Sequence, residues 1–294
     1  MSLPADLRDL TRGLDVRSAS RVHGGDIAVA YRLETADGPL FAKTHPRPTP
    51  DLFEREAAGL IALREQAPHE LRVPRVLRES PHGLVLEWIA EGGRRTSGRG
   101  GTEAELGRGL ATLHGAGRRE GRTASGGLDG ATFGYLGSVQ VDLTPTDDWA
   151  DFYVHRRLAP LVARAVEVGS LDPRACGVLD GLAPRAQELC GPPEPPALLH
   201  GDLWAGNRLI DAHGRNWLID PAVHWGHREV DLAMMQLFGG FGPECVAAYD
   251  ETWPLADGWR ERVPWYQLAP LLVHAILFGG SYGDAALRAL TRYA

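Results

Sequence analysis

Strand signals crowd into the first 90 residues of this chain, and this uneven distribution constrains its fold more than any other feature. Residues 27–33 alternate apolar and polar side chains, and 40–44 continue as a strand after a turn. A short apolar run at 83–89, bounded by turn residues, predicts a buried strand. We therefore expect an antiparallel hairpin and a further strand in this part of the chain.

Helical periodicity dominates beyond a Gly- and Arg-rich stretch at 91–101, which is typical of a linker. One more hairpin is expected at 207–220, whereas 120–146 is rich in Gly, Ser and Thr and predicts an irregular loop. The predicted fold class is therefore α+β, with an antiparallel sheet plus a helix over 1–90 and a mostly helical lobe over 91–294. The helices expected in this second lobe are about 103–116, 147–168, 174–190, 228–238, 243–251 and 264–279.

The helix of the first lobe is expected immediately after Thr49-Pro50-Asp51. These residues would supply an N-cap, a proline at the first helical position and an acid for the helix dipole. Glu56 lies on the inward face of this helix and requires a partner, because a buried unpaired carboxylate is costly; Glu54 points to solvent. The helix should run to about Arg64, and the apolar residues of its inward face are Phe53, Ala57, Leu60 and Ile61.

Composition excludes several classes of protein. The chain has 294 residues, of which 44% are hydrophobic and 23% charged, as in ordinary globular proteins. It has no apolar run near the roughly 18 residues of a transmembrane helix and no secretory signal pattern, so no membrane contact is expected. A net charge of −7 argues against nucleic acid binding. Cys176, Cys190 and Cys245 are scattered and odd in number, which predicts no disulfides, no structural zinc and a reducing, cytoplasmic setting.

Two scarce residue types mark candidate functional positions. Of the 31 basic residues, Lys43 is the only lysine, and Asn207 and Asn216 are the only asparagines. An ammonium is a compact, strongly hydrated point charge, whereas a guanidinium is a planar fork, so a single retained lysine indicates a site that needs the ammonium. The alternative is an ordinary surface lysine.

The candidate catalytic loop is His200-Gly201-Asp202, followed five residues later by Asn207. This Asp-x4-Asn spacing matches what phosphoryl transfer requires. The carboxylate of Asp202 can reach an attacking hydroxyl, and the amide oxygen of Asn207 can face a metal ion. Asp220, brought back by the hairpin, can hold Mg²⁺ that bridges the phosphates of ATP. His200 is more typical of a structural hydrogen-bonding residue than of a base.

The first lobe offers groups that suit the nucleotide. Lys43 can contact the α and β phosphates if Glu56 holds it in place. Gly24 and Gly25 would let backbone N–H groups approach the phosphates without an obstructing Cβ. Each of these signals is weak alone, and a Gly-Gly pair before a strand is most often a turn. Their order along the chain, ending in the Asp-x4-Asn loop and Asp220, favours a kinase.

The chain resembles the fructosamine kinase (ketosamine-3-kinase) family, a branch of the bilobal protein-kinase-like fold related to aminoglycoside and choline kinases. The resemblance runs almost from end to end. Its most specific stretch is Leu199 to Asn207, where Trp204 follows the Asp-Leu pair, together with Gly226-His227-Arg228-Glu229 after the metal aspartate. Further similar segments are 54–56, 148–153, 218–223, 230–234, 238–241 and 277–280.

This resemblance implies transfer of the γ-phosphate of ATP, with Mg²⁺, to a sugar hydroxyl of a ketosamine, the rearranged adduct of a sugar and an amine. The product is commonly the 3-phosphate, which decomposes and frees the amine. By similarity Asp202 is the catalytic base, and Asp231 holds the backbone of the catalytic loop. The other implied roles are Mg²⁺ binding by Asn207 and Asp220, phosphate contact by Lys43 paired with Glu56, adenine binding by the backbone of Glu87, Trp88 and Ile89, and sugar contact by Trp204, His224, His227 and Glu229.

Three other interpretations remain open at this stage. His224, His227 and Glu229 could serve a metal-dependent hydrolase, although no third ligand follows at suitable spacing. A kinase-like binding module without activity is disfavoured because the five phosphate-site residues are all present. An aminoglycoside or other amino-alcohol kinase would share that machinery and differ in its acceptor pocket. The sequence does not indicate whether the acceptor is a small ketosamine or a glycated protein lysine, nor the oligomeric state.

Overall fold

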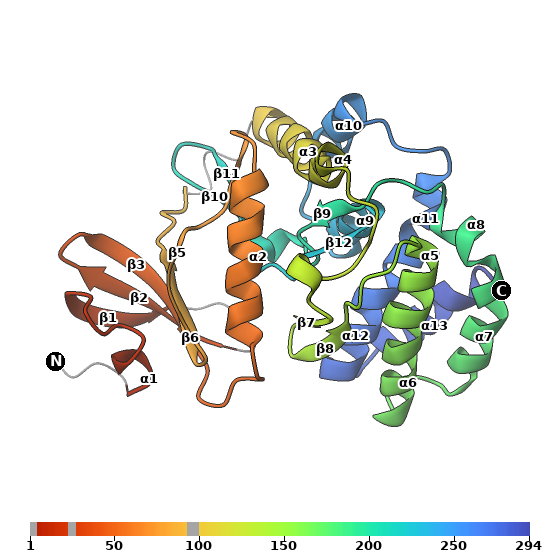
Figure 1. The fold of residues 1–294 in the computed structure, drawn as a ribbon, viewed down its shortest axis with the longest axis horizontal. Helices are drawn as coiled ribbons and strands as arrows, with labels where there is room; N and C mark the ends of the chain where they lie inside the picture. Colours follow the sequence, from red (N-terminus) through yellow and green to blue (C-terminus); the bar gives the residue numbers. More distant parts are fainter. Residues whose placement is uncertain (1–4, 23–27, 93–99) are drawn as a thin grey trace.

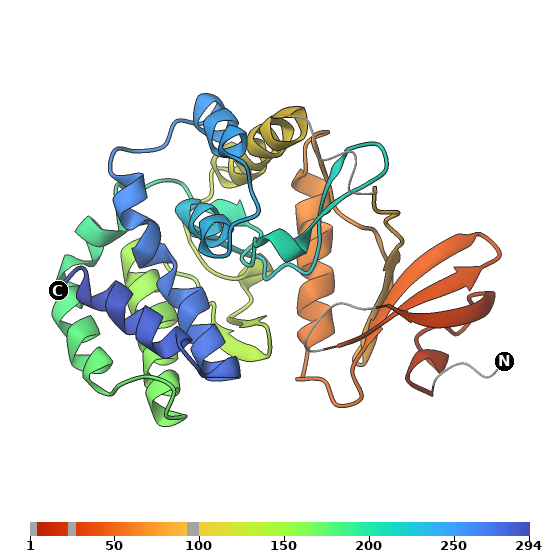
Figure 2. The same ribbon diagram turned by 180° about the vertical axis from the view of Figure 1, so that it is seen from behind.

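The computed structural model describes residues 5–22, 28–92 and 100–294, with side chains described for 7–22, 28–92 and 102–294. A five-stranded antiparallel sheet in the order β1-β2-β3-β6-β5 forms one end of the molecule (Figure 1). Helix α2 lies between this sheet and the helix-rich remainder, and the view from behind in Figure 2 shows the same order. The elements of this first part are α1 (Ala5–Arg8), β1 (Val16–Val22), β2 (Val29–Thr35), β3 (Gly38–Thr44), α2 (Leu52–Gln66), β4 (Leu71–Arg72), β5 (Val76–Ser80) and β6 (Gly83–Glu87).

Both faces of the sheet are covered, because successive residues of a strand point to opposite sides. Val85 joins the cluster that includes Leu7 and Leu33 on the outer face, beside α1. Leu84 and Leu86 join the larger cluster that includes the buried face of α2. This double burial explains why β6 reads as a continuous apolar run rather than an alternating one.

Helix α2 differs from the expectation in two details. It begins at Leu52, after Asp51 in a left-handed conformation with φ of 59°, and no side chain caps it, so the predicted Thr49 cap is wrong. Ile61 is 46% exposed, and Leu63 takes its place on the buried face. Position 63 lies three residues after Leu60 on the same face, whereas 61 has already turned towards solvent.

The second part is mostly helical, as expected. Its helices are α3 (Gly100–His114), α4 (Ala116–Glu120), α5 (Trp149–Asp151), a π-helix (Phe152–Leu158), α6 (Ala159–Glu167), α7 (Arg174–Leu182), α8 (Ala186–Cys190), α9 (Glu229–Leu237), α10 (Pro243–Thr252), α11 (Trp259–Tyr266), α12 (Leu268–Phe278) and α13 (Tyr282–Thr291). Its strands are β7 (Phe133–Leu136), β8 (Val139–Asp142), β9 (Ala197–Leu199), β10 (Arg208–Ile210), β11 (Asn216–Leu218) and β12 (His224–Gly226).

Some predicted elements are subdivided or replaced. Strands β7 and β8 form a hairpin within 120–146, where an irregular loop was expected. The helix predicted over 147–168 contains the π-helical turn, and the one over 174–190 is interrupted by a 3₁₀ turn at Ala183–Arg185, which contains Pro184. Prolines favour such breaks because they donate no backbone hydrogen bond.

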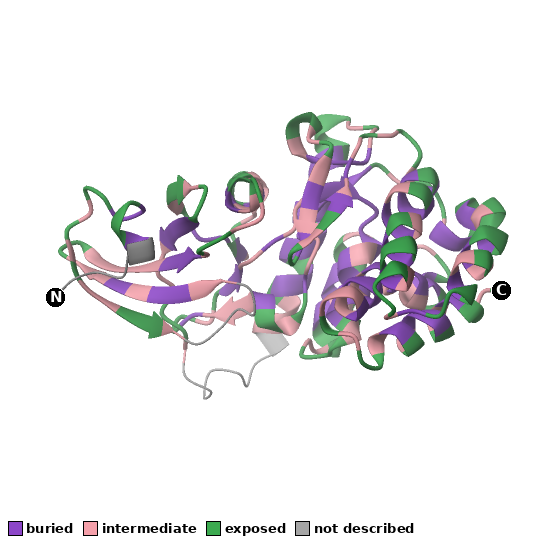
Figure 3. Cartoon of the chain, turned by 90° about the horizontal axis from the view of Figure 1, so that it is seen from below, coloured by how far each residue is buried: buried purple, intermediate pink, exposed green. Residues whose placement is uncertain are grey.

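The two parts of the chain are joined by backbone pairing as well as by packing. Strands β10 and β11 pair antiparallel and form the predicted second hairpin. Strand β4 of the first part runs parallel to β11 and completes this small sheet. Figure 3 shows buried segments through the sheet and along the inward sides of the helices, with exposed segments at the periphery. Among the helices described, none is both long and apolar enough to cross a membrane.

Candidate active site

The catalytic loop after β9 is held by Asp231, which the start of α9 places beneath it. The carboxylate of Asp231 accepts hydrogen bonds from the backbone N–H of His200 at 2.7 Å and of Gly201 at 2.9 Å. Burial opposes the charged form, but bonds from His114 and Gly201 hold the pKa of Asp231 below its usual range. The predicted structural role of Asp231 is confirmed.

His200 and Gly201 fix the position of Asp202. The Nδ1 atom of His200 accepts from the backbone N–H of Asp202 at 3.3 Å, which leaves Nε2–H to donate to the carbonyl of Ile219 at 2.9 Å. Burial lowers the pKa of His200, so the ring is neutral, as a structural histidine should be. Gly201 has φ of 82°, and a Cβ there would lie 2.1 Å from the carbonyl oxygen of Ala222, so only glycine fits.

Asp202 has the environment of a base poised near neutral pH. Its Oδ2 atom accepts a hydrogen bond of 3.0 Å from the amide of Asn207, which also donates to the carbonyl of Asp202 at 2.8 Å. Burial raises the pKa of Asp202 to about 6, against the effect of Asn207 and with smaller contributions from Asp220 and Asp231. A carboxylate of this pKa is ionised at pH 7 yet can hold a proton transiently.

Lys43 joins the two parts of the chain electrostatically. Its Nζ lies 2.5 Å from Oε1 of Glu56 and 2.7 Å from Oδ1 of Asp220, and its side chain is 11% exposed. Burial alone would lower the pKa of Lys43, but the two carboxylates outweigh it and raise the pKa above the usual value. Burial raises the pKa of Glu56 to about 7, partly offset by Lys43. The expected partnership of Glu56 with Lys43 is confirmed.

Asp220 and Asn207 present the oxygen atoms that a hard cation requires. Asp220 follows β11 in a left-handed conformation with φ of 52°. Lys43 helps to hold the pKa of Asp220 below its usual range despite burial, so the carboxylate is charged. Asn207 turns its amide nitrogen to Asp202, and within the described residues no protein donor contacts its amide oxygen. This donor set fits Mg²⁺.

A single cavity of about 1110 Å³ connects these groups. Its walls include Lys43, Glu56, Asp202, Asn207 and Asp220. They also include the three hinge residues Glu87, Trp88 and Ile89 of the predicted adenine site, and Trp204 and His224 of the predicted sugar site. The volume exceeds that of an ordinary small-ligand pocket, as a site for two substrates requires.

The hinge residues are fixed by contacts outside the cavity. Glu87 accepts from the backbone N–H of Arg75 at 3.2 Å, and the Arg32 guanidinium lies 4.8 Å from the centre of the Trp88 ring. Within the described residues, the backbone N–H of Ile89 donates to no protein group, which leaves it available to a ligand. Gly24 and Gly25 lie outside the described residues, and their phosphate contact stays a prediction.

Known proteins share both the sequence and the fold of this chain. The family model for fructosamine kinase matches residues 7–294. The chain belongs to the fructosamine kinase family. It is 35% identical over 268 residues to the protein named "Probable ketoamine kinase" in Enterococcus faecium, covering 90% of each chain. It is 32% identical to the chloroplastic protein-ribulosamine 3-kinase of Arabidopsis thaliana, covering 97% of this chain and 85% of that one.

Solved structures agree with this membership. A crystal structure from Thermobifida fusca, assigned as a fructosamine-3-kinase, superposes with a TM-score of 0.87 at 35% identity and covers 99% of both chains. A choline/ethanolamine kinase family protein from Mesorhizobium loti has a TM-score of 0.61 at 17% identity, covering 98% of this chain and 92% of that one, and shares the fold alone. The predicted protein-kinase-like fold is thereby confirmed.

Glu229 and His227, which the family resemblance assigned to the sugar, do not line the cavity. Glu229 accepts two hydrogen bonds from Arg262, of 2.8 and 2.6 Å, and His227 stacks on Tyr266 with ring centres 5.4 Å apart. Both side chains are buried, because the turn from β12 to α9 carries them against α11 rather than towards Asp202. We therefore assign them a structural role in this kinase.

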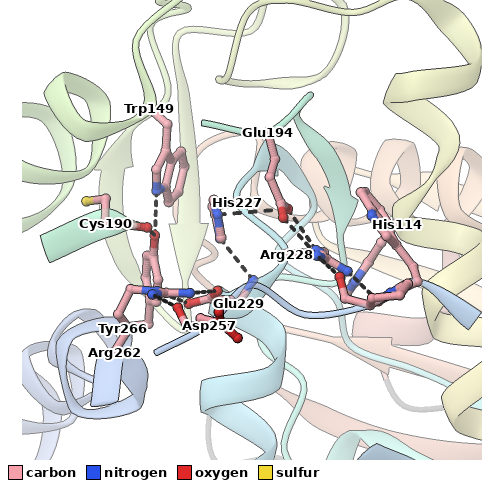
Figure 4. A network of polar contacts seen from close by, with 12 residues as sticks. His114, Trp149, Cys190, Glu194, His227, Arg228, Glu229, Asp257, Arg262 and Tyr266 are labelled. Atoms are coloured by element: carbon pink, nitrogen blue, oxygen red, sulfur yellow. Dashed lines mark hydrogen bonds and ion pairs between the residues drawn. The ribbon is translucent and has the colours of Figure 1, made fainter. Parts of the chain in front are cut away.

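The same network removes the basis for a zinc-dependent hydrolase. Both carboxylate oxygens of Glu229 bond to Arg262, and Nε2 of His227 lies 3.9 Å from Glu194, which is itself paired with Arg228 (Figure 4). Across residues 5–22, 28–92 and 100–294, no group of three His, Cys, Asp or Glu side chains could hold a metal ion.

Replacing Glu229 with glutamine should destabilise the kinase without weakening acceptor binding. The substitution leaves the buried guanidinium of Arg262 without its counter-charge, which costs about 3–5 kcal/mol. Denaturant unfolding measures the loss, and the KM for the acceptor should stay at the wild-type value. The matched control is Glu188→Gln, because Glu188 forms an equally bidentate but exposed pair with Arg185, and its loss should leave the unfolding midpoint close to that of the wild type. A raised KM with unchanged stability would return Glu229 to the substrate site.

Proposed function

We propose that this chain transfers the γ-phosphate of ATP to a sugar hydroxyl of a ketosamine, at the 3-position. The observation that carries the proposal is the convergence of Lys43, Glu56 and Asp220 with Asp202 and Asn207 on one cavity, in a member of the fructosamine kinase family. The ketosamine and the 3-position come from the related proteins named as ketoamine kinase and ribulosamine 3-kinase.

ATP occupies the end of the cavity that contains the hinge. Its adenine bonds to the backbone at Glu87 to Ile89, where the N–H of Ile89 is available, and its phosphates reach Lys43 and the glycines at 24 and 25. Glu56 pairs with the ammonium and keeps it in place, so that Asp220 would remain available to hold the metal. The ammonium then neutralises phosphate charge without the bulk of a guanidinium.

Asn207 and Asp220 would hold Mg²⁺ through their amide and carboxylate oxygens. When bound, the ion neutralises charge on the phosphates and aligns the γ-phosphate with the acceptor. The hydrogen bond from Asn207 to Asp202 ties the geometry of the metal ligand to that of the base. Because this hydrogen bond holds Asp202 and Asn207 together, the base and the metal ligand keep a fixed distance from each other.

Asp202 orients the acceptor hydroxyl and takes its proton as the oxygen bonds to the γ-phosphorus. The bond from that phosphorus to the bridging oxygen breaks, and ADP leaves. The backbone N–H groups of His200 and Gly201 donate hydrogen bonds to the carboxylate of Asp231, which prevents the loop from relaxing away from the phosphate. Trp204, 40% exposed at the cavity wall, and the buried His224 contact the sugar. We infer a nucleotide lobe over 1–90 and a catalytic lobe over 91–294, with the active site between them.

We also propose a reducing, cytoplasmic location. Cys176, Cys190 and Cys245 are free, and burial raises the pKa of Cys190 and of Cys245 to about 12. The thiols of Cys190 and Cys245 are therefore protonated at neutral pH, and they pack as small apolar groups.

Release of ADP tests the proposal across acceptor classes. Fructosyl-lysine, ribulosyl-lysine and a glycated protein should each be screened with ATP and Mg²⁺ beside kanamycin and choline, with the Asp202→Asn variant as the control. We expect activity with at least one ketosamine and none with kanamycin or choline. Activity with the latter two alone would identify an amino-alcohol kinase instead, and the glycated protein shows whether a protein-bound lysine is accepted.

A further inference from the structure

Arg157 differs from the other buried arginines of this chain. Arg228 and Arg262 each form a bidentate pair with a carboxylate, Glu194 and Glu229 respectively (Figure 4), and Arg208 pairs with Glu103. Arg157 is 3% exposed, yet within the described residues its guanidinium has neither a hydrogen-bond acceptor nor an ion-pair partner. The guanidinium lies 5.7 Å from the centre of the Phe152 ring, and Tyr153 and Asp142 act on its charge without bonding to it.

A buried cation without a counter-charge is costly to the folded protein. Burial lowers the pKa of Arg157 only to about 10, so the side chain is still charged at neutral pH. The nearby carboxylate of Asp142 opposes this lowering of the pKa electrostatically, but it forms no hydrogen bond to Arg157, since its oxygens bond to Arg156 and to the backbone N–H of Thr144. The free protein therefore keeps a guanidinium whose bonding capacity is unused.

The position of Arg157 in the fold shows which part of the molecule its free N–H groups face. The residue lines the large cavity together with Tyr153 and His224, and it lies in the π-helical turn, a geometry frequent at functional sites. Phe152 lies between Arg157 and His224, since its ring also stacks on that of His224 with ring centres 6.5 Å apart. A Cβ on Gly201, next to Asp202, would lie 3.1 Å from Nδ1 of His224. Arg157 thus belongs to the acceptor end of the cavity.

The surroundings of the guanidinium favour an anion. Burial and the charge of Arg157 lower the pKa of His224 to about 4, so His224 is neutral. The cavity wall around Arg157 also includes the apolar residues Leu136, Val141, Val230 and Met234. In such a low-dielectric site a planar guanidinium binds a carboxylate or a phosphate through two parallel hydrogen bonds.

We propose that Arg157 is a specificity residue that binds an oxyanion, a carboxylate or a phosphate, on the acceptor molecule. This inference rests on the proposed function, because it names a second group on the ketosamine besides the reacting hydroxyl. The same charge disfavours polycationic acceptors such as aminoglycosides. The acceptors preferred by this chain are therefore acidic ketosamines.

Matched acceptors that differ only in charge test the proposal. N-fructosylglycine should be compared with N-fructosylglycinamide for the carboxylate, and N-fructosylglycinamide 6-phosphate with the same amide for the phosphate. Hydrogen bonds to charged groups predict a kcat/KM at least about tenfold higher for one of the two charged acceptors. Equal kcat/KM values within both pairs would overturn the oxyanion site, whereas no turnover with any ketosamine would contradict the proposed function itself.

Variants locate the preference. Arg157→Met should reduce the charged-to-neutral ratio of kcat/KM to about one, and Arg164→Met, at an exposed arginine of α6 outside the cavity wall, should leave the ratio unchanged. The Tm of Arg157→Met should equal or exceed that of the wild type, because an unpaired buried charge is removed. An unchanged ratio in Arg157→Met would overturn the proposal, since it would mean that Arg157 contacts the transferred phosphate or serves the fold. A lowered Tm would likewise show that the free protein uses the guanidinium.

Discussion

Replacing Asp202 with asparagine is expected to lower turnover by at least about 10³-fold while ATP still binds. The amide has nearly the shape of the carboxylate, but it cannot accept the proton of the acceptor hydroxyl. Asn207 donates to Oδ2 of Asp202, and the loop is held from behind by Asp231, so the backbone should stay in place. Single-turnover phosphoryl transfer gives the chemical step, and calorimetric titration with ADP and Mg²⁺ gives nucleotide affinity.

The control for this variant is Asp129→Asn. Asp129 also lines the cavity but is exposed and has no place in the proposed mechanism, so its removal should leave turnover within a few-fold of the wild type. Near-normal turnover in Asp202→Asn would exclude Asp202 as the base. A parallel loss of ADP affinity would instead indicate that the carboxylate is needed to assemble the nucleotide site.

Replacing Lys43 with arginine is expected to lower kcat/KM for ATP by about 10²-fold or more, although the charge is kept. The ammonium of Lys43 lies between Glu56 and Asp220 in a nearly closed site, where a guanidinium does not fit without displacing one carboxylate. Lys43→Met removes the charge at similar length and should be equally impaired. Initial rates over a range of ATP concentrations measure the effect.

The comparison of Lys43→Arg with Lys43→Met shows whether ATP use depends on the shape of the cation at position 43 or only on its charge. If Lys43→Arg retained wild-type kcat/KM while Lys43→Met did not, any cation would suffice at this position and the argument from the single lysine would be wrong. If both variants were fully active, Lys43 would not contact the phosphates at all.

The residues of the proposed phosphate site could be predicted because short sequence patterns determine their positions. The Asp-x4-Asn loop and the hairpin that returns Asp220 are short-range features, and helical spacing alone placed Glu56 on the inward side of α2, where it meets Lys43. The scarcity of lysine and asparagine added a second signal that does not depend on secondary structure.

The remaining features depend on contacts between distant segments. His227 and Glu229 follow the metal aspartate closely in sequence, but their orientation is set by Arg262 and Tyr266 of α11, more than 30 residues later. Ile61 lies outside the core because the helix turns it towards solvent, and Leu63 is buried in its place. Arg157 was missed because a sequence rich in arginine gives no sign of which guanidinium lacks a partner.

Phosphorus NMR of the reaction product tests the central claim most directly. After incubation of fructosyl-lysine with ATP, Mg²⁺ and the wild-type protein, we predict a new phosphomonoester signal coupled to the proton on carbon 3 of the sugar, absent with Asp202→Asn. Consumption of ATP to ADP and inorganic phosphate while fructosyl-lysine is recovered intact, with no free lysine formed by decomposition of a 3-phosphate, would contradict the account.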